Sequence, residues 1–385
     1  MDLTEFDFEI RTRMVFGLDA IDRLGELAKG LGVRQALVVS DPGIVAAGHV
    51  QRGLDALQAA GIESTLFDGA RENPTTREVA AGVEVARSCQ PDLLVGLGGG
   101  SSMDCAKGIN FLYTNGGQMQ DYWGVGKATK EMLPMIAVPT TAGTGSEMQS
   151  FALISDPQTH VKMACGDSRA SCRVAILDPR LTLTQPPQVT ALTGVDALSH
   201  ALETFVTLRR TAISATFSRQ AFEWLASCLP KVIQDPADLQ SRGGMQLGAA
   251  LAGLAIENSM LGASHALANP LTARYGIAHG QAVGVMLPQV IRYNGQVVER
   301  LYGQLWTRIG GGNRSERTSG AAEALADWVE QMVDGAGLKT RLEALGVARE
   351  ALPELAELAA KQWTGQFNPR PVDTGSLLEL YQQVF

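Results

Sequence analysis

Hydrophobic and polar residues are arranged in two different ways along the chain, and the change falls near residue 190. From residue 15 to about residue 190, short apolar runs alternate with segments of helical periodicity, which is typical of an α/β layer with a mostly parallel sheet. Beyond the Pro186-Pro187 pair, alanine- and leucine-rich helical periodicity dominates. We therefore expect an α/β domain over residues 1–189 and an all-α domain over residues 190–385.

The first region repeats a unit of one helix and one buried strand. The pattern predicts helices over 20–29, 44–60 and 75–89, and strands over 37–40, 64–67, 93–97 and 135–138. The turn signal Asp41-Pro42-Gly43 closes the first of these strands. Each strand ends in a loop of polar or glycine residues, and open α/β sheets bind their ligands at that edge.

Two of these loops have the composition of a nucleotide site. The first follows the strand 93–97 and contains Gly98, Gly99, Gly100, Ser101 and Ser102. Glycines let a pyrophosphate approach the backbone, and the next helix offers its free N–H groups and positive end. The second follows the strand 135–138 and carries the hydroxyls of Thr140, Thr141 and Thr144. A tight turn and a polar surface loop are the alternative explanations of these two segments.

Asp41 ends the first predicted strand, where a carboxylate can accept hydrogen bonds from the ribose of an adenosine. Its charge would also repel a 2′-phosphate, which favours NAD over NADP. The alternative is that Asp41 only begins a turn.

The histidines indicate a metal centre in the helical region. Asp196 and His200 are four residues apart, so both side chains lie on one face of a helix. His265 and His279 would complete a set of one carboxylate and three imidazoles, which suits Fe(II) or Zn(II) and would suit Mg or Ca poorly. A single histidine in an apolar helix is more often a hydrogen-bonded core residue, but small residues surround these ones.

Length, net charge and cysteine content limit the classes of protein to which the chain can belong. The chain has 385 residues, of which 45% are hydrophobic, so it is long enough for two or three folded domains. A net charge of −8 without a basic cluster argues against nucleic acid and anionic membranes as main partners. The acidic start lacks the pattern of a signal peptide, and no run is long and apolar enough for a membrane span, so we expect a cytoplasmic protein. Five cysteines without a CxxC pair predict neither a disulfide framework nor a zinc ribbon.

Together these segments resemble the iron-containing (group III) alcohol dehydrogenase family almost end to end. The resemblance is carried by residues 16–17, 98–104, 139–147, 193–203, 265–280 and 368–371. It implies a dehydroquinate synthase-like architecture and places the family's metal ligands on Asp196, His200, His265 and His279. The two loops then hold the pyrophosphate and the nicotinamide ribose, and Lys162 matches a lysine that contacts this ribose.

The resemblance also implies the activity. We expect an alcohol dehydrogenase that depends on Fe²⁺, with Zn²⁺ as the other candidate, and transfers hydride between an alcohol or aldehyde and NAD(H). The metal ligands His265 and His279 are the expected catalytic residues, and Phe151 and Ile256 are expected to line the substrate pocket. A homodimer is expected from the family. One departure is Asn269, where many members have a histidine assigned to proton transfer.

Two other functions are compatible with these motifs. A metal-dependent lyase or synthase of the dehydroquinate synthase type uses the same scaffold, but it grips its anionic substrate with more basic residues than Arg274 alone. A regulatory protein that binds nucleotide and metal without turnover is the second alternative.

Overall fold

The computed structural model describes residues 5–159, 161–311 and 320–385, and the chain forms two compact units. One unit comprises Glu9–Gln185, and the other comprises Pro186–Phe385 together with residues 5–8. The division therefore falls before the Pro186-Pro187 pair, against the predicted boundary between 189 and 190. The reason is local: Pro187 already begins the first long helix of the second unit, since proline suits the first turn of a helix.

The α/β unit contains a six-stranded parallel sheet, which confirms the predicted fold class. Its strands lie in the order β1 (Arg13–Phe16), β9 (Val174–Leu177), β6 (Met135–Pro139), β4 (Leu93–Gly98), β2 (Gln35–Val39) and β3 (Glu63–Phe67). A smaller sheet joins β5 (Gly124–Val125), β8 (Lys162–Gly166) and β7 (Phe151–Ser155), with β7 antiparallel to β8. The strands β1, β5, β7, β8 and β9 were not predicted individually.

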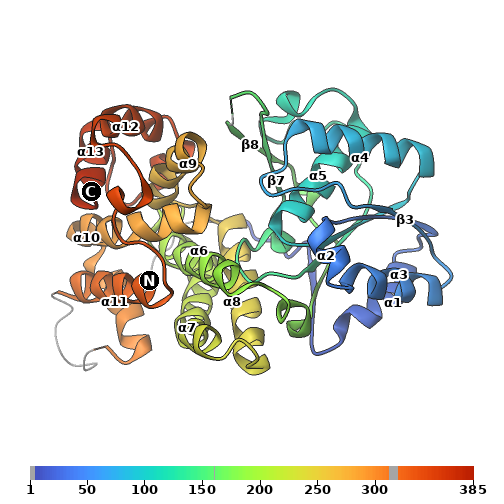
Figure 1. The fold of residues 1–385 in the computed structure, drawn as a ribbon, viewed down its shortest axis with the longest axis horizontal. Helices are drawn as coiled ribbons and strands as arrows, with labels where there is room; N and C mark the ends of the chain where they lie inside the picture. The colour runs from blue at the N-terminus through green and yellow to red at the C-terminus, as the bar shows by residue number, and fades with distance from the viewer. Residues whose placement is uncertain (1–4, 160, 312–319) are drawn as a thin grey trace. The chain divides into compact units, whose positions relative to one another are not determined.

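Both faces of the large sheet are buried. Leu37 and Val39 pack in the cluster that includes α4 (Thr76–Cys89) and α5 (Gly100–Asn115), whereas Val38 packs in the cluster that includes α1 (Leu24–Gly30) and α3 (His49–Ala59). Figure 1 shows these two pairs of helices on opposite sides of the strands. Burial on both faces explains why these strands are nearly continuous apolar runs in the sequence.

The predicted helix 44–60 is wrong as a single element. The structure has two helices there, α2 (Pro42–Ala46) and α3, separated by Gly48 with φ of 81°. Glycine reaches this left-handed conformation without a steric penalty, so the chain can turn between two helical segments. The signal for the interruption was the glycine itself.

The described part of the second unit is helical and contains no strand, as predicted. Its main helices are α6 (Pro187–Val206), α7 (Ala212–Gln234), α8 (Leu239–Glu257), α9 (Ala263–Tyr275), α10 (His279–Trp306), α11 (Ala321–Gly335), α12 (Leu352–Ala360) and α13 (Thr374–Gln383). Among the described residues, no helix is both long and apolar enough to cross a membrane.

Candidate metal and nucleotide sites

Helix α6 presents three acidic and imidazole side chains on one face. Asp196, His200 and Glu203 follow one another at intervals of four and three residues, which is the spacing of one helix face. All three are almost fully buried, with 4–5% of each residue exposed. Asp196 Oδ1 lies 3.4 Å from His200 Nε2, so the predicted pair on a helix face is present.

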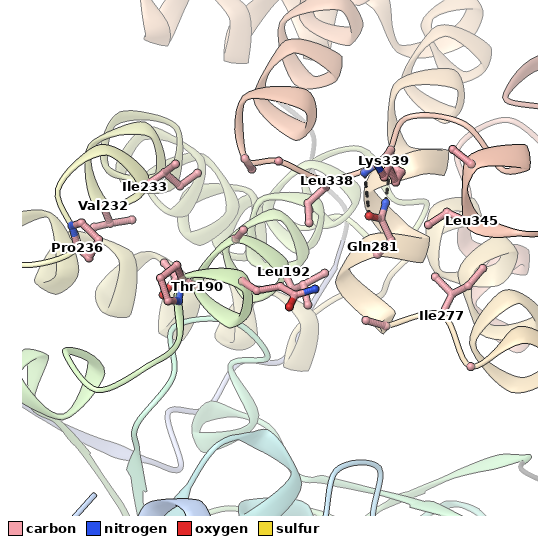
Figure 2. Close-up of a pocket in the computed structure, with 18 of the residues that line it drawn as sticks. Thr190, Leu192, Val232, Ile233, Pro236, Ile277, Gln281, Leu338, Lys339 and Leu345 are labelled. Atoms are coloured by element: carbon pink, nitrogen blue, oxygen red, sulfur yellow. Dashed lines mark hydrogen bonds between the residues drawn. The ribbon is translucent and has the colours of Figure 1, made fainter.

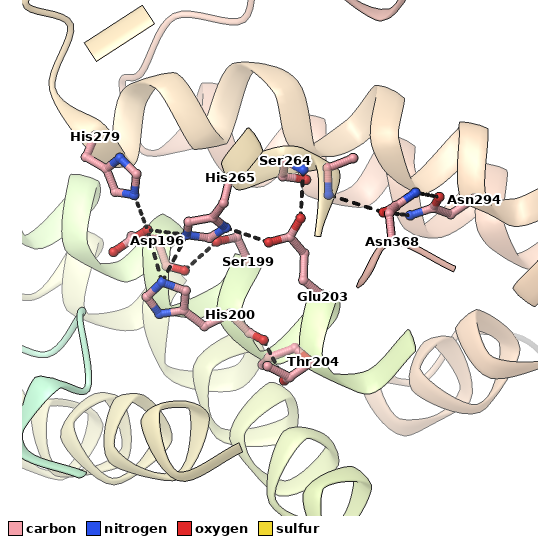
Figure 3. Close-up of polar contacts among 12 residues, drawn as sticks. Asp196, Ser199, His200, Glu203, Thr204, Ser264, His265, His279, Asn294 and Asn368 are labelled. Atoms are coloured by element: carbon pink, nitrogen blue, oxygen red, sulfur yellow. Dashed lines mark hydrogen bonds and ion pairs between the residues drawn. The ribbon is translucent and has the colours of Figure 1, made fainter. Parts of the chain in front are cut away.

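Two histidines from other helices reach the same point. His265 stands in the first turn of α9, and His279 is the first residue of α10. The Nε2 atom of His265 lies 3.2 Å from that of His200 and 3.6 Å from Asp196 Oδ1, and His279 Nε2 lies 3.7 Å from this oxygen. Figure 3 shows the three imidazole rings around the Asp196 carboxylate. The structure thus brings together four side chains separated by up to 83 positions in the sequence.

The chemistry of this cluster fits a divalent cation. Asp196 Oδ1 is buried and accepts no hydrogen bond from the described residues, although an unsatisfied buried acceptor is costly. Burial alone would raise the pKa of Asp196, but the imidazoles of His200, His265 and His279 outweigh it and hold the pKa well below its usual value. One carboxylate oxygen with nearby imidazole nitrogens is a donor set for Fe(II) or Zn(II).

Glu203 fixes the orientation of His265 and was not predicted as a site residue. His265 Nδ1 lies 2.5 Å from Glu203 Oε2, and since a carboxylate can only accept, Nδ1 carries the proton. The other oxygen, Oε1, accepts from the backbone N–H of Ser264 at 2.7 Å. Burial raises the pKa of Glu203, but His265 outweighs it, so the group stays ionised. Nε2, on the side of Asp196, is therefore the nitrogen of His265 that can bind a metal.

Asn368 fixes the backbone at the start of α9. Its Oδ1 accepts from the backbone N–H of Ala263 at 3.2 Å and from the Nδ2 group of Asn294 at 3.0 Å. A Cβ atom on Gly262 would lie 2.9 Å from Asn368 Oδ1 and 3.2 Å from Glu203 Oε1. Only a glycine leaves room for both partners, which explains why Gly262 precedes the helix that carries His265.

The two glycine- and threonine-containing loops touch each other in the α/β unit. Strands β4 and β6 are parallel neighbours, and Gly98 pairs with Pro139, so both loops leave the same edge of the sheet. A Cβ atom on Gly100 would lie 2.6 Å from Thr144 Cγ2, and one on Gly99 would lie 3.5 Å from Thr141 Cγ2. The hydroxyl of Thr140 is buried and makes no hydrogen bond within the described residues. The glycines therefore allow the two loops to pack against each other at this edge of the sheet.

Asp41, predicted to bind a ribose with a simple turn as the alternative, is the N-cap residue of α2. Its Oδ1 accepts from the backbone N–H groups of Gly43 and Ile44 at 3.0 and 3.1 Å, which caps the helix. Its Oδ2 accepts from the hydroxyl of Ser102 at 3.1 Å. Gly98 makes this approach possible, since a Cβ there would lie 2.5 Å from Ser102 Oγ.

Lys162 and Ser101 meet through Asn73, a residue that the sequence did not single out. Lys162 Nζ donates to Asn73 Oδ1 at 3.0 Å, and the backbone N–H of Asn73 donates to Ser101 Oγ at 3.3 Å. Asn73 has φ of 50°, in the left-handed region that asparagine tolerates better than most residues. The dipeptide Asn73-Pro74 was the available signal, since such pairs often mark a turn.

Lys107 is a second residue that the sequence did not indicate. It is fully buried in α5, and its Nζ atom donates to the carbonyls of Ser146, Gln149 and Phe151 at 2.6, 2.7 and 3.0 Å. It also donates to Ser146 Oγ at 2.9 Å, and this hydroxyl donates to Asp104. The ammonium therefore ties the second loop and the start of β7 to α5.

Two family models match the two parts of this chain. The family model described as iron-containing alcohol dehydrogenase matches residues 11–179, and the model of the C-terminal part of the Fe-containing alcohol dehydrogenase family matches residues 190–385. The chain belongs to the iron-containing alcohol dehydrogenase family. It is thus a member of a family of metal-dependent alcohol dehydrogenases.

The relatives of this chain differ in the substrate for which they are named. The chain is 35% identical over 381 residues to a choline dehydrogenase of Bacillus subtilis (strain 168), covering 98% of this chain and 94% of that protein. A solved 1,3-propanediol oxidoreductase matches with a TM-score of 0.96 at 34% identity, covering 99% and 100% of the two chains. A sulfoacetaldehyde reductase from Bifidobacterium kashiwanohense, solved with NAD⁺, matches with a TM-score of 0.88 at 28% identity over 99% of both chains.

The remaining predicted residues of the chain are distributed over the two units. Phe151 is the first residue of β7, and Ile256 lies near the end of α8. Their role in lining the substrate pocket stays a prediction. Asn269 Nδ2 donates to Gln362 Oε1 at 2.9 Å. Of the histidines without a predicted role, His49 contacts Thr184 Oγ1 at 2.8 Å and His160 lies outside the described residues.

Proposed function

We propose that this protein is an NAD-dependent alcohol dehydrogenase whose iron is held by Asp196, His200, His265 and His279. The observation that carries the proposal is the convergence of three Nε2 atoms on one buried carboxylate oxygen that has no hydrogen bond of its own. A divalent cation would compensate that carboxylate, and the four donors suit Fe²⁺ as well as Zn²⁺.

The residues of the helical unit have separate tasks in this proposal. A divalent ion bound there supplies a Lewis acid that lowers the pKa of an alcohol hydroxyl or polarises a carbonyl. Glu203 keeps the proton of His265 on Nδ1, so that Nε2 stays a ligand. Asn368 fixes the backbone from which His265 projects. These contacts hold the donor atoms in a constant geometry toward a small alcohol or aldehyde.

The α/β unit would bind NAD as the hydride acceptor. Gly98, Gly99, Gly100, Ser101 and Ser102 together with Thr140, Thr141 and Thr144 would surround the pyrophosphate and nicotinamide ribose, and Lys162 would contact this ribose. Asp41 would bind the hydroxyls of the adenosine ribose and repel a 2′-phosphate, which favours NAD over NADP. The NAD⁺ complex of the sulfoacetaldehyde reductase supports this choice of cofactor by similarity.

Proton transfer would not use a side chain at position 269. An amide does not titrate, and Asn269 is engaged with Gln362. We infer that the alcohol proton leaves through water or a ribose hydroxyl.

Turnover and metal content test the proposal directly. Protein purified without oxygen should contain about one iron per chain and should produce absorbance at 340 nm with NAD and an alcohol such as 1,3-propanediol or choline. Nucleotide binding without turnover on a broad panel of alcohols and aldehydes would favour the regulatory protein instead. Substrate conversion without net reduction of NAD would favour the lyase or synthase.

We also propose that the protein is a cytoplasmic homodimer. All five cysteines are free thiols, which suits a reducing compartment. Strand β1 is the last strand on one side of the large sheet. Phe16, its last residue, is 46% exposed, and Ile10, which precedes the strand, is 62% exposed. An edge strand with exposed apolar side chains tends to pair with another chain. Sedimentation of the purified protein should give twice the mass of one chain, and a monomer would contradict the proposal.

A further inference from the structure

The helical unit contains a groove of about 630 Å³ that no predicted site residue lines. It lies among the first turns of α6, the end of α7, the α9–α10 connection and the segment after α11 (Figure 2). Its volume falls within the range of cavities that bind small molecules. The walls are largely apolar; the apolar residues labelled in Figure 2 are Leu192, Val232, Ile233, Pro236, Ile277, Leu338 and Leu345.

Arg242, which lines this groove from α8, carries a positive charge that the protein does not compensate. The residue is 2% exposed. Its Nε donates to the Pro236 carbonyl at 2.9 Å and its Nη1 donates to Thr190 Oγ1 at 3.2 Å, so the guanidinium is held by two neutral acceptors. Its Nη2 finds no acceptor in the part of the chain that the structure describes. Burial lowers the pKa of Arg242, and no carboxylate opposes this effect.

A buried arginine without a carboxylate is unusual, because a buried charge is costly unless it is paired. The guanidinium has a planar set of donors that matches a carboxylate, and two of its three nitrogens are already fixed here. The third nitrogen is therefore a preoriented donor without a partner.

The other charged residue that lines the groove is also positively charged. Lys339 lines it, and its backbone is held by Gln281, whose Nε2 donates to the Lys339 carbonyl at 2.7 Å and whose Oε1 accepts from the Lys339 N–H at 2.9 Å (Figure 2). Among the described residues that line the groove there is no aspartate or glutamate. This is a local positive site in a protein of net charge −8.

We propose that this groove binds a small organic anion, a monocarboxylate with an apolar body. Its carboxylate would pair with Arg242 and Lys339, and its body would lie against the apolar wall. None of the metal or nucleotide residues contributes to the groove, so the proposal does not depend on the alcohol dehydrogenase activity.

Calorimetric titration of the metal-loaded protein with octanoate tests this proposal, and octanamide serves as the uncharged probe of equal length. We expect octanoate to bind at least tenfold more tightly than octanamide. Arg242→Gln should weaken octanoate binding at least tenfold, and Lys339→Gln, which changes an exposed side chain and leaves the fold intact, should weaken it at least threefold. Lys29→Gln removes the same charge from an exposed position on the α/β unit and should leave the affinity unchanged.

Three results would overturn the inference. The first is the absence of octanoate binding to the parent protein. The second is equal affinity for octanoate and octanamide, which would leave the two cations without a role. The third is an octanoate affinity that is unchanged in Lys339→Gln, which would place the anion elsewhere, for example at the metal centre.

Discussion

The carboxylate of Glu203 determines which nitrogen of His265 is available to a metal. In Glu203→Gln, the amide can still accept from the Ser264 N–H, but its NH₂ group would then face His265 Nδ1. Nδ1 would have to become the acceptor, and the proton would move to Nε2, which could no longer bind a cation. We expect the dissociation constant of the metal to rise roughly 10- to 100-fold. Competition with a fluorescent chelator measures it, and Glu379→Gln, the same change at an exposed residue, should match the parent.

Asp41 caps α2, and its proposed second role, the selection of NAD over NADP, can be tested with two substitutions. Asn keeps an oxygen that can cap α2, whereas Gly removes both the cap and the charge. We expect Asp41→Asn and Asp41→Gly both to raise kcat/KM for NADP relative to NAD by about tenfold or more, because both remove the repulsion of the 2′-phosphate. Steady-state rates with the two nucleotides decide it. If neither variant gains with NADP, or Asp55→Asn on α3 gains as much, the carboxylate of Asp41 has no part in selectivity.

At the scale of elements, Lys107 connects α5 to the loop that carries Thr144. The Ser146 N–H donates to Thr144 Oγ1 at 3.2 Å and Gln149 Nε2 donates to the Thr144 carbonyl at 2.8 Å. Since Lys107 holds the carbonyls of Ser146 and Gln149, its ammonium positions Thr144 through them. Lys107→Met should therefore disorder this loop, because the carbonyls of Gln149 and Phe151 lose the ammonium that donates to them and the Ser146 carbonyl keeps only the N–H of Gln149.

The expected result for Lys107→Met is a dissociation constant for NAD at least tenfold higher, while that for AMP, which lacks the nicotinamide half, changes less than threefold. Titrations with both nucleotides below the unfolding temperature of the variant measure the ratio. Lys130→Met is the control at an exposed lysine. Equal losses for NAD and AMP would mean that Lys107 only stabilises the α/β unit.

At the scale of the whole molecule, periodicity was sufficient to predict an α/β region followed by a helical region. Helical spacing placed Asp196 and His200 on one helix face, whereas His265 and His279 were added from the clustering of histidines and the family resemblance. Glu203 could have been predicted, since it continues the face of Asp196 and His200. Lys107 could not, because its acceptors are carbonyls 39 to 44 positions away that no residue type marks. The role proposed for Arg242 could not be predicted either, because it depends on the absence of a carboxylate near its guanidinium, which only the fold shows. Short strands such as β5, with two residues, are too short to show the alternation of apolar and polar residues that predicts a strand.

Removal of the metal should make the stability of the whole protein depend on pH in a defined direction. Burial lowers the pKa of His265, but Glu203 and Asp196 outweigh it and raise the pKa to about 9 from 6.5 in the metal-free protein. A raised pKa stabilises the folded state fully below pH 6.5, and this contribution is lost as the pH rises through about 9. At 1.36 kcal/mol for each pH unit, the loss amounts to about 3 kcal/mol.

Urea unfolding of the metal-free protein between pH 6 and 9.5 measures this loss, and the metal-free His265→Ala variant is its control, which should show a much smaller decrease. The metal-loaded protein should behave differently over the same range. Its bound cation replaces the proton on Nε2, and metal binding strengthens as its ligands deprotonate. A metal-free protein that is equally stable at pH 6.5 and 9 would contradict the expectation, because His265 would then gain nothing from Glu203 and Asp196 on folding.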